Sequence, residues 1–274
     1  MTLYTSTVVV PRRPSRVWAK IGENTAYALG LPVVLIVIWG IWATISPAKF
    51  FPSPSKLAQA FVETWIGPAF VTDVLPSLGR LAAGILIAIL VGIVAGAVIG
   101  LTRWLRELLE PTLEFFRAVP PPVLLPIVVV LMGPTDVMKI TMIVVGSVWP
   151  VLLNTIEGVR ATDQIMKETA RSFALTTPER LRFLVLPAAS PRIMAGVRQS
   201  LSIALILMVI SELGYSSSGL GFQIVYFQRN YLIAEMWSGI LLLGLIGVLL
   251  AAIFSVVERR VLRWYHGIKE VERV

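Results

Sequence analysis

The chain contains six long apolar runs, and this feature limits its possible folds more than any other. Five runs contain no Asp, Glu, Lys or Arg, and one contains a single Arg; they are Asn24–Ala48, Leu81–Thr102, Ala118–Thr135, Ile140–Ile156, Ile193–Ile210 and Met236–Val257. Each has roughly the 17–25 residues that a helix needs to cross a bilayer. Lipid offers no partners to an irregular backbone, and the runs lack the alternation of barrel strands. We therefore expect an all-α polytopic membrane protein with about six transmembrane helices.

The distribution of basic residues predicts the orientation of these helices. If the N-terminus is cytoplasmic, the opposite side holds Lys49, Lys56, Lys139 and Arg229, besides Arg80 at the start of the second span. The basic residues of the other loops and of both tails then lie on the cytoplasmic side, as the positive-inside rule requires. The net charge of +8 is mostly this asymmetry, so it does not indicate a nucleic-acid partner. We expect both termini in the cytoplasm.

One membrane domain accounts for most of the chain. We expect it to cover residues 24–258, between cytoplasmic tails at 1–23 and 259–274. The first apolar run is longer than that of a signal peptide, which favours a retained helix. Only 15% of the residues are charged, against about a quarter in soluble domains, and no hydrophilic segment is long enough for a second domain.

The sequence lacks the signatures of common catalytic sites. It contains no G-x-x-x-x-G-K-[ST] phosphate loop, no H-E-x-x-H and no G-x-S-x-G. It has no cysteine, and its single histidine, His266, cannot form a metal cluster. The spans also lack the group of His, Asp, Glu or Ser residues that an intramembrane enzyme needs. We therefore expect no catalytic residue, bound cofactor or metal in this chain.

Two spans contain residues that disturb a helix. The third opens with Pro120-Pro121-Pro122 and adds Pro126, and the fourth contains Pro150 and Asn154. Proline leaves helix carbonyls without a partner, and broken helices line the sites of many transporters. The third span is therefore either a broken helix at a translocation path or a kinked packing helix. Pro121 and Asn154 are our candidate path residues.

Glu212 is an acid at membrane depth, at the outer end of the fifth span. A carboxylate there is costly and usually paired, so we expect a structural or gating role, with Arg80 as the candidate counter-ion. Tyr215 and Ser217 follow in a Ser/Gly-rich loop that shapes an outer gate, receives a binding protein or is a flexible connection. Arg198, in the fifth span, either extends to the cytoplasmic surface or pairs with an acid along the path.

The cytoplasmic loop 159–192 is predicted to form two short helices. The first covers Asp163–Phe173. Thr177-Pro178-Glu179 begins the second, because Thr is a good N-cap, Pro suits the first helical position and Glu suits the first turn. We expect this helix to end before Pro187, and Ser190-Pro191 to begin the fifth span. A simple connector is much shorter, so the loop indicates docking to a soluble partner.

The spacing within this loop has a counterpart in a known family. Glu168-Thr169-Ala170 is followed after three residues by Ala174, and further on by Leu186-Pro187. The arrangement resembles the EAA loop of ATP-binding cassette importer permeases, in which Glu-Ala-Ala precedes a Gly and then a hydrophobic-Pro pair. Thr169 and Ala174 depart from that pattern. Because Ala disfavours the left-handed conformation that Gly adopts, we expect a different bend here, or a negative φ at Ala174.

Other segments, over about residues 50–265, resemble the nitrate, sulfonate and taurine branch of these permeases. They are Phe51-Pro52-Ser53-Pro54, Arg117-Ala118-Val119-Pro120-Pro121, Leu125-Pro126, Asn154-Thr155, Gly158-Val159, and Ser217-Ser218-Gly219-Leu220-Gly221 after Glu212. The resemblance implies a type I importer permease fold in a bacterial cytoplasmic (inner) membrane. It also implies a small solute, which we expect to be an anion.

The resemblance further implies partners. Such permeases form dimers, usually homodimers. Two copies of a cytoplasmic ATPase, which uses ATP and Mg, dock on the loops of the dimer. An extracytoplasmic binding protein delivers the solute. Glu168 is then expected to order the loop or contact the ATPase, while Phe173 and Leu175 enter an ATPase groove or pack on the membrane-facing side. The implied coupling residues are Glu168, Thr169, Ala170, Phe173, Ala174, Leu175, Leu186 and Pro187.

An ion-gradient-driven secondary transporter is the main alternative. Such proteins often show inverted repeats and intramembrane acids that couple transport to the ion. This sequence shows no clear internal repeat and few acids at depth. Dependence of uptake on ATP distinguishes the two classes.

Overall fold

The computed structural model describes residues 15–45, 50–265 and 267, and all regular structure among them is helical. Much of the predicted tails, at 1–23 and 259–274, lies outside these residues. Helix α1, Ser15–Ile45, begins within the first predicted tail. Contacts divide the chain into two compact units, residues 1–58 and 59–274, which are described separately.

The first unit contains α1 and the start of α2, Pro54–Trp65. The apolar part of α1 is Gly30–Ile45, shorter than the long spans of the second unit. Its large side chains, such as Ile38, are exposed, as suits a helix that contacts lipid. After the helix, the ring of Phe51 lies edge-on to Trp42, with centroids 5.8 Å apart.

The second unit contains four helical segments long and apolar enough to cross a membrane. They are Phe70–Leu101, Asp136–Arg160 (α6), Thr177–Gly214 and Ile233–Val261 (α11). The first consists of a π-helical turn followed by α3, Leu75–Leu101. The third consists of α8, Thr177–Arg180, a π-helical turn, and α9, Leu186–Gly214. A bent pair of helices counts as a fifth. With the apolar part of α1, these segments confirm the predicted all-α polytopic fold.

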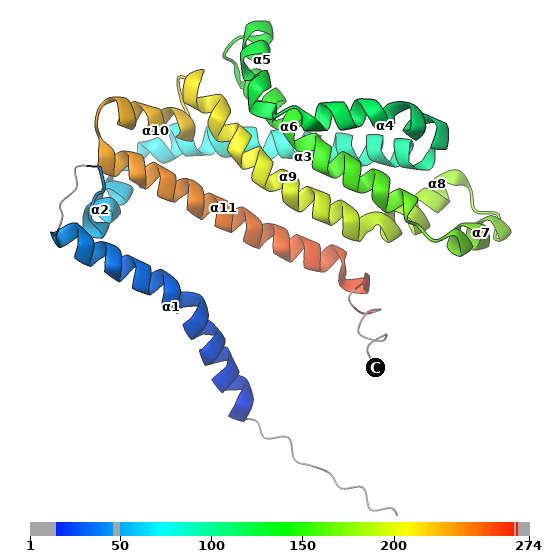
Figure 1. Ribbon diagram of the computed structural model, residues 1–274, viewed down its shortest axis with the longest axis horizontal. Helices are drawn as coiled ribbons and strands as arrows, with labels where there is room; N and C mark the ends of the chain where they lie inside the picture. Colours follow the sequence, from blue (N-terminus) through cyan, green and yellow to red (C-terminus); the bar gives the residue numbers. More distant parts are fainter. Residues whose placement is uncertain (1–14, 46–49, 266, 268–274) are drawn as a thin grey trace, which may run out of the picture. The chain divides into compact units, whose positions relative to one another are not determined.

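Helix α6 packs between α3 and α9, and glycines allow the close approach (Figure 1). A Cβ on Gly96 of α3 would lie 2.6 Å from the Cβ of Thr155 in α6. On the other side of α6, a Cβ on Gly196 of α9 would lie 2.6 Å from the carbonyl oxygen of Pro150. Such small residues let helix backbones pack closely in membranes, where little hydrophobic effect draws helices together.

Each π-helical turn precedes a Leu-Pro pair, Leu75-Pro76 or Leu186-Pro187. The N–H of Leu75 bonds to the carbonyl of Phe70, and that of Leu186 to the carbonyl of Leu181, which is the wide i→i+5 pattern. Proline has no N–H, and its ring clashes with a normal preceding turn. The wider turn accommodates the ring, so each helix continues through its proline.

The predicted boundaries at Pro187 and at Ser190-Pro191 are therefore wrong. Helix α8 continues through the turn Leu181–Val185 into α9, which begins at Leu186. The Ser190 hydroxyl donates to the carbonyl of Pro187 at 2.8 Å, inside α9 rather than at its start. The helical loop and the fifth span form one segment.

The third predicted span is broken rather than kinked, and its place at a translocation path stays a prediction. Helix α4, Arg103–Ala118, is followed by extended backbone at Val119, a 3₁₀ turn, Pro121–Leu124, and α5, Leu125–Met132. The two parts are bent by 86°. Because α5 has only eight residues, it extends about 12 Å and does not cross a bilayer alone.

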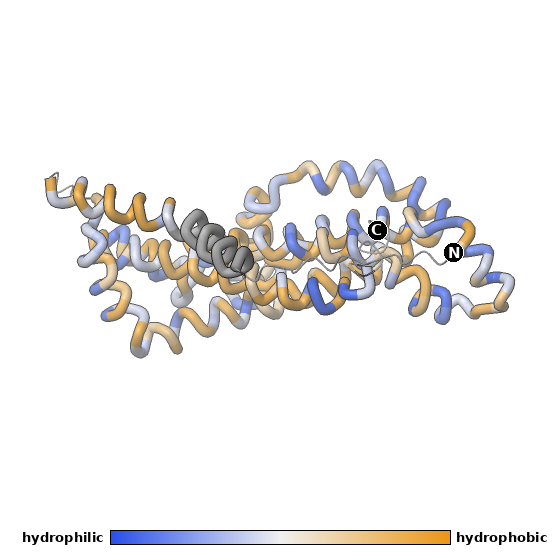
Figure 2. The backbone as a smooth tube through the Cα atoms, turned by 90° about the horizontal axis from the view of Figure 1, so that it is seen from below, coloured by the Kyte–Doolittle hydropathy of each residue, from blue (hydrophilic) through white to orange (hydrophobic). Residues whose placement is uncertain are grey.

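The two ends of the second unit differ in character. Helix α10, Leu220–Arg229, and the loop before it lie at one end, and α7, Gln164–Ser172, with α8 at the other (Figure 1). Figure 2 shows hydrophobic residues along the long helices and more hydrophilic residues toward the α7 end. This end carries the predicted coupling loop, and the α10 end carries Glu212.

Candidate functional site

Helix α7 forms the projecting loop between α6 and α9. The Asp163 side chain caps it, accepting hydrogen bonds from the N–H groups of Ile165 and Met166 at 2.7 and 3.2 Å. The helix covers Gln164–Ser172, so the predicted first loop helix, Asp163–Phe173, is confirmed to within its capping residues. The sequence thus encodes a structured projection rather than a plain connector.

Ala174 ends this helix in the left-handed conformation that its side chain disfavours, with a φ of 52°. Its N–H bonds to the carbonyl of Arg171 at 2.8 Å, and the N–H of Leu175 bonds to the carbonyl of Ala170 at 3.1 Å. This is the double hydrogen-bond pattern of a Schellman cap, in which glycine is the usual residue at the left-handed position. The expectation of a changed bend or a negative φ is therefore wrong: the loop keeps the glycine geometry with alanine.

The loop buries one side of α7 and exposes apolar side chains on the other. Ala170 is buried, whereas Phe173 is 76% exposed and Ile165 is 73% exposed. Leu175 is only 37% exposed and is therefore partly covered, whereas most of the Phe173 side chain is free. Apolar side chains on a charged, projecting loop are typical of a docking surface.

The polar coupling candidates make local bonds within α7. Glu168 is exposed and accepts a hydrogen bond from Gln164 at 3.1 Å. Thr169 is exposed, and its hydroxyl donates to the carbonyl of Ile165 at 2.9 Å. Leu186 and Pro187 are half-buried at the start of α9, so the structure places them in the base of the loop rather than on its exposed face.

The second helix of the loop starts one residue earlier than predicted. Thr176, not Thr177, is the N-cap of α8, and Thr177 and Pro178 occupy its first turn. The N–H and hydroxyl of Thr176 both donate to the Glu179 carboxylate, at 2.8 and 2.6 Å. The carboxylate satisfies a backbone donor that the helix itself leaves free, so the predicted start signal is correct in kind.

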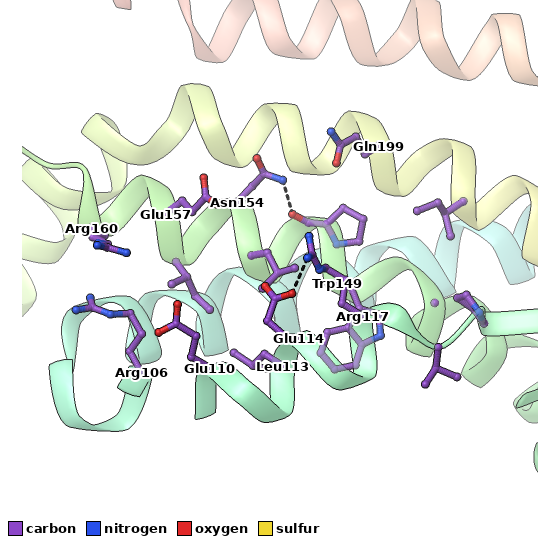
Figure 3. Close-up of a pocket in the computed structure, with 17 residues that line it drawn as sticks. Arg106, Glu110, Leu113, Glu114, Arg117, Trp149, Asn154, Glu157, Arg160 and Gln199 are labelled. Carbon is purple, nitrogen blue, oxygen red and sulfur yellow. Dashed lines mark hydrogen bonds and ion pairs between the residues drawn. The ribbon is translucent and has the colours of Figure 1, made fainter. Parts of the chain in front are cut away.

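A groove of about 390 Å³ lies between α4, α6 and α9, and Figure 3 shows its lining. Both path candidates line it, Pro121 at the break after α4 and Asn154 in α6. The Asn154 amide donates to the carbonyl of Pro150 at 2.8 Å. This bond gives a hydrogen-bond partner to a backbone carbonyl in a helix that proline interrupts. Gln199 of α9 also lines the groove.

Charged side chains of both signs line this groove. They are Arg106, Arg117 and Arg160, with Glu110, Glu114 and Glu157. Arg117 pairs with Glu114 along α4 (Figure 3). None of these six residues was among the predicted site residues, and the charges of residues 103–117 were assigned to a cytoplasmic loop. The alternation of apolar and charged residues in Arg103–Ala118, which places Leu105, Leu109 and Leu113 on one face, was the available signal.

Glu212 lies outside the groove, in a buried polar network near the α10 end. It is fully buried, and its carboxylate accepts hydrogen bonds from Arg80 at 2.6 Å, from the Ser77 hydroxyl at 2.8 Å and from the Gly221 N–H at 3.0 Å. The predicted pairing of Glu212 with Arg80 is confirmed. Arg80 also bonds to Asp136 at 2.9 Å, so this residue of α3 connects to both α9 and α6.

The same network fixes the backbone after α9. Asp73, in the π-helical turn before α3, accepts the N–H of Gly219 at 2.8 Å, and Ser77 accepts the N–H of Leu220 at 2.9 Å. Asp73 and Ser77 were not among the predicted site residues. Asp73, Ser77 and Arg80 follow one another at steps of four and three residues, which places all three on one helical face and was a usable signal.

Tyr215 and Ser217 are exposed in the loop that the network secures. They do not line the groove, so the structure does not bring them together with Pro121 and Asn154. Arg198 pairs with Glu258 of α11 and lies over the Phe254 ring, 5.7 Å from its centroid. Arg198 thus pairs with an acid, but Glu258 does not line the groove, so pairing along the path stays a prediction.

Residues 84–265 match the model of a family described as the binding-protein-dependent transport system inner membrane component. The chain belongs to this family. The match covers most of the second unit, including α6, α7, α9 and α11. The protein is therefore the permease subunit of an ATP-binding cassette importer, with no strand or soluble domain in the part that the structure describes.

Curated relatives support this identification over nearly the whole chain. The taurine transport system permease protein TauC of Escherichia coli is 29% identical over 256 residues, which are 90% of this chain and 92% of TauC. The bicarbonate transport system permease protein CmpB of Synechococcus elongatus is 33% identical over 266 residues, 92% of this chain and 95% of CmpB. A Bacillus subtilis permease named for aliphatic sulfonates transport, SsuC, is 29% identical over 265 residues, 95% of this chain and 94% of SsuC.

Solved structures show the same fold. A chain of the inward-facing MetNI methionine ABC transporter has a TM-score of 0.59 at 19% identity, over 69% of this permease and 94% of that chain. An amino acid ABC transporter crystallised with histidines has a TM-score of 0.56 at 18% identity, over 75% of this permease and 96% of that chain. These neighbours confirm the predicted type I importer permease fold.

Proposed function

We propose that this permease forms the membrane path of an ATP-driven importer for a small anion. It has its α7 end in the cytoplasm, pairs with a second copy of itself, and receives its solute at the α10 end from a binding protein. Two copies of a soluble ATPase, which binds ATP and Mg, dock on the two α7 loops. The permease contributes no catalytic residue: it converts closure of the ATPases into alternating access.

The exposed apolar face of α7 is the observation that carries this proposal. Ile165, Met166 and Phe173 together expose more apolar surface than a free loop in water favours. A capped helix with a complete Schellman turn holds them in a fixed geometry. Because α7 is joined to α6 and, through α8, to α9, movement of a docked partner would be transmitted directly to two of the three helices that line the groove.

The groove supports a small polar solute. Its volume of about 390 Å³ suits a small molecule, and its arginines, glutamates and amides provide both charge and hydrogen bonds. The named solutes of three relatives, taurine, aliphatic sulfonates and bicarbonate, all carry an anionic group. Arg117 and Arg160 are the groups on the groove wall that would attract such a solute.

A gradient-driven transporter is less well supported. The coupling acid of such a transporter must gain and lose an ion. The Glu212 carboxylate instead accepts hydrogen bonds from Arg80, Ser77 and the Gly221 N–H, which hold it in place. We therefore assign Glu212 a role in holding the outer loop rather than in ion coupling.

Docking is tested by affinity purification from native membranes, with the subunits counted by mass spectrometry. We expect a soluble ATPase at one copy per permease, retained by Phe173→Leu and reduced at least tenfold by Phe173→Asp, which places a charge in an apolar contact. Recovery of the permease alone, with full uptake into vesicles that lack ATP, would overturn the proposal.

Orientation has an independent test, because the chain has no cysteine. Single substitutions Ser172→Cys in α7 and Ser217→Cys before α10 place exposed thiols at opposite ends. An impermeant maleimide should label Ser217→Cys in intact cells and Ser172→Cys only after permeabilisation. The reverse pattern would reject the proposed orientation and leave the docking test unaffected.

A further inference from the structure

A second cavity, of about 310 Å³, lies beneath α7 where it faces the membrane domain. Lys167 and Arg171 of α7 form one wall, and Thr177 and Arg180 of α8 form another. Apolar residues complete it; they are Gly100, Leu101, Val159, Leu181, Leu184 and Val185. The cavity is distinct from the groove at α4, and no residue lines both.

The cavity is basic, with no acidic residue in its wall. Lys167 is half-buried, and neither it nor Arg171 forms an ion pair with any described residue. Arg180 makes only a long bond, of 3.3 Å, to the Thr177 hydroxyl. Three converging cations with no compensating carboxylate form a site for an anion.

The nearby acids are engaged elsewhere, which keeps the cavity basic. Asp163 caps α7, Glu168 accepts from Gln164, and Glu179 accepts from Thr176. None of these carboxylates lines the cavity or forms an ion pair with Lys167, Arg171 or Arg180. The positive charge of the cavity is therefore built into the fold of the loop.

The cavity lies at the boundary between apolar and polar parts of the helices. Gly100 and Leu101 end α3, whose preceding residues form a charge-free run, and Leu101 is 47% exposed. A ligand here has an apolar surface on one side and cations on the other. An anionic phospholipid matches both, because its phosphate and its acyl chains meet at this depth.

We propose that this cavity binds the phosphate group of an anionic phospholipid headgroup. Lys167 and Arg171 hold it from α7, and Arg180 and Thr177 hold it from α8. The bound phosphate thereby connects α7 to the base of the loop, and the lipid stabilises the position of the coupling helix.

The test is native mass spectrometry of the purified full-length permease, titrated with phosphatidylglycerol, phosphatidylcholine or inorganic phosphate. We expect one phosphatidylglycerol to bind more tightly than phosphatidylcholine. The double variant K167Q/R171Q should weaken binding roughly 30-fold, because each cation near a headgroup phosphate contributes about a factor of five. K167R/R171K keeps both charges and should bind as the wild type does.

Arg182→Gln is the matched control, since Arg182 is an exposed cation of the same segment that does not line the cavity. It should leave lipid binding unchanged. Equal binding of both lipids, or equal losses in K167Q/R171Q and Arg182→Gln, would overturn the proposal. Tight binding of inorganic phosphate that displaces phosphatidylglycerol would also overturn the lipid assignment, because it identifies a free anion as the ligand.

Discussion

Arg80 and Glu212 form an ion pair, 2.6 Å long, in which the two side chains are 6% and 0% exposed. They are 132 residues apart in the sequence and connect α3 to the end of α9 that precedes α10. Burial of two charges costs solvation energy that the pair alone does not reliably recover. The additional bonds from Ser77 and Gly221 satisfy the remaining carboxylate lone pairs, so the network stabilises one arrangement of the outer loop.

Removal of one partner should therefore be much more harmful than removal of both. We expect Glu212→Gln to lower the stability by up to about 3 kcal/mol, because it leaves the buried Arg80 charge with only the exposed carboxylate of Asp136 as a counter-ion. The double variant R80Q/E212Q should cost less than the sum of the two single variants. Thermal unfolding of the detergent-solubilised permease, followed by tryptophan fluorescence, measures this coupling.

Arg198→Gln is the control for this cycle. Arg198 is 61% exposed and pairs with Glu258, so its loss should cost no more than about 1 kcal/mol. Additive effects of the Arg80 and Glu212 substitutions would contradict the role that we assign to the buried pair.

Gly219→Ala tests the outer loop without changing a charge. Gly219 has a φ of 119°, and a Cβ there would lie 2.5 Å from the carboxylate carbon of Glu212. The substitution should displace the loop, reduce uptake and lower the unfolding temperature, because alanine is strained in this conformation and also meets a fixed group. Gly214→Ala, five residues earlier, meets no atom within 4 Å and should have little effect. Similar losses in both variants would indicate a general sensitivity of the loop.

The membrane domain was predictable because lipid imposes a simple rule on sequence. Charge-free runs of sufficient length must be helical, and the positions of the α3, α6, α9 and α11 spans followed from them. The break after α4 was predicted only as an alternative. Prolines such as Pro121 indicate that a helix is disturbed, but the neighbouring helices decide whether the result is a kink or an 86° bend.

Helix boundaries near prolines were less predictable, for a specific reason. A proline usually ends or kinks a helix, yet Pro187 follows a π-helical turn that accommodates its ring. Likewise, Ala174 was expected to avoid a positive φ. The two hydrogen bonds of the Schellman turn and the burial of Ala170 outweigh a local preference of about 1 kcal/mol.

Network and groove residues were predicted only in part. The Arg80–Glu212 pair followed from the cost of a charge at membrane depth. The spacing of Asp73 and Ser77 places them on the face of Arg80, but they bond to backbone N–H groups more than 140 positions away, and no local pattern identifies these partners. The groove charges of α4 were missed because a charged segment was taken as a loop.

Ala174→Gly should stabilise the coupling loop. Glycine adopts the φ of 52° without the steric cost that alanine bears, which predicts a gain of about 1 kcal/mol in the local stability of α7. Slower hydrogen exchange of the α7 amides would measure it. Ala161→Gly is the matched control: Ala161 caps α6 with a φ of −74°, so glycine there should give no gain. Faster exchange in Ala174→Gly would show that the left-handed turn is not strained.

Asn154→Asp should separate a translocation path from a structural groove. The Asn154 amide bonds to the carbonyl four residues earlier at 2.8 Å and lines the groove, so the substitution removes a donor and adds a negative charge there. For an anionic solute we expect initial uptake to fall by about tenfold, because a charge at about 10 Å in a partly polar environment opposes entry by more than 1 kcal/mol. Asn230→Asp makes the same change to an equivalent bond, from Asn230 to the carbonyl of Tyr226 at 2.7 Å, but outside the groove. It should leave uptake within twofold of the wild type, since only the helix-end hydrogen bond is lost. Equal uptake by Asn154→Asp and the wild type, at normal amounts of folded permease, would show that the anion does not pass this wall of α6 and would move the path to another face of the helix.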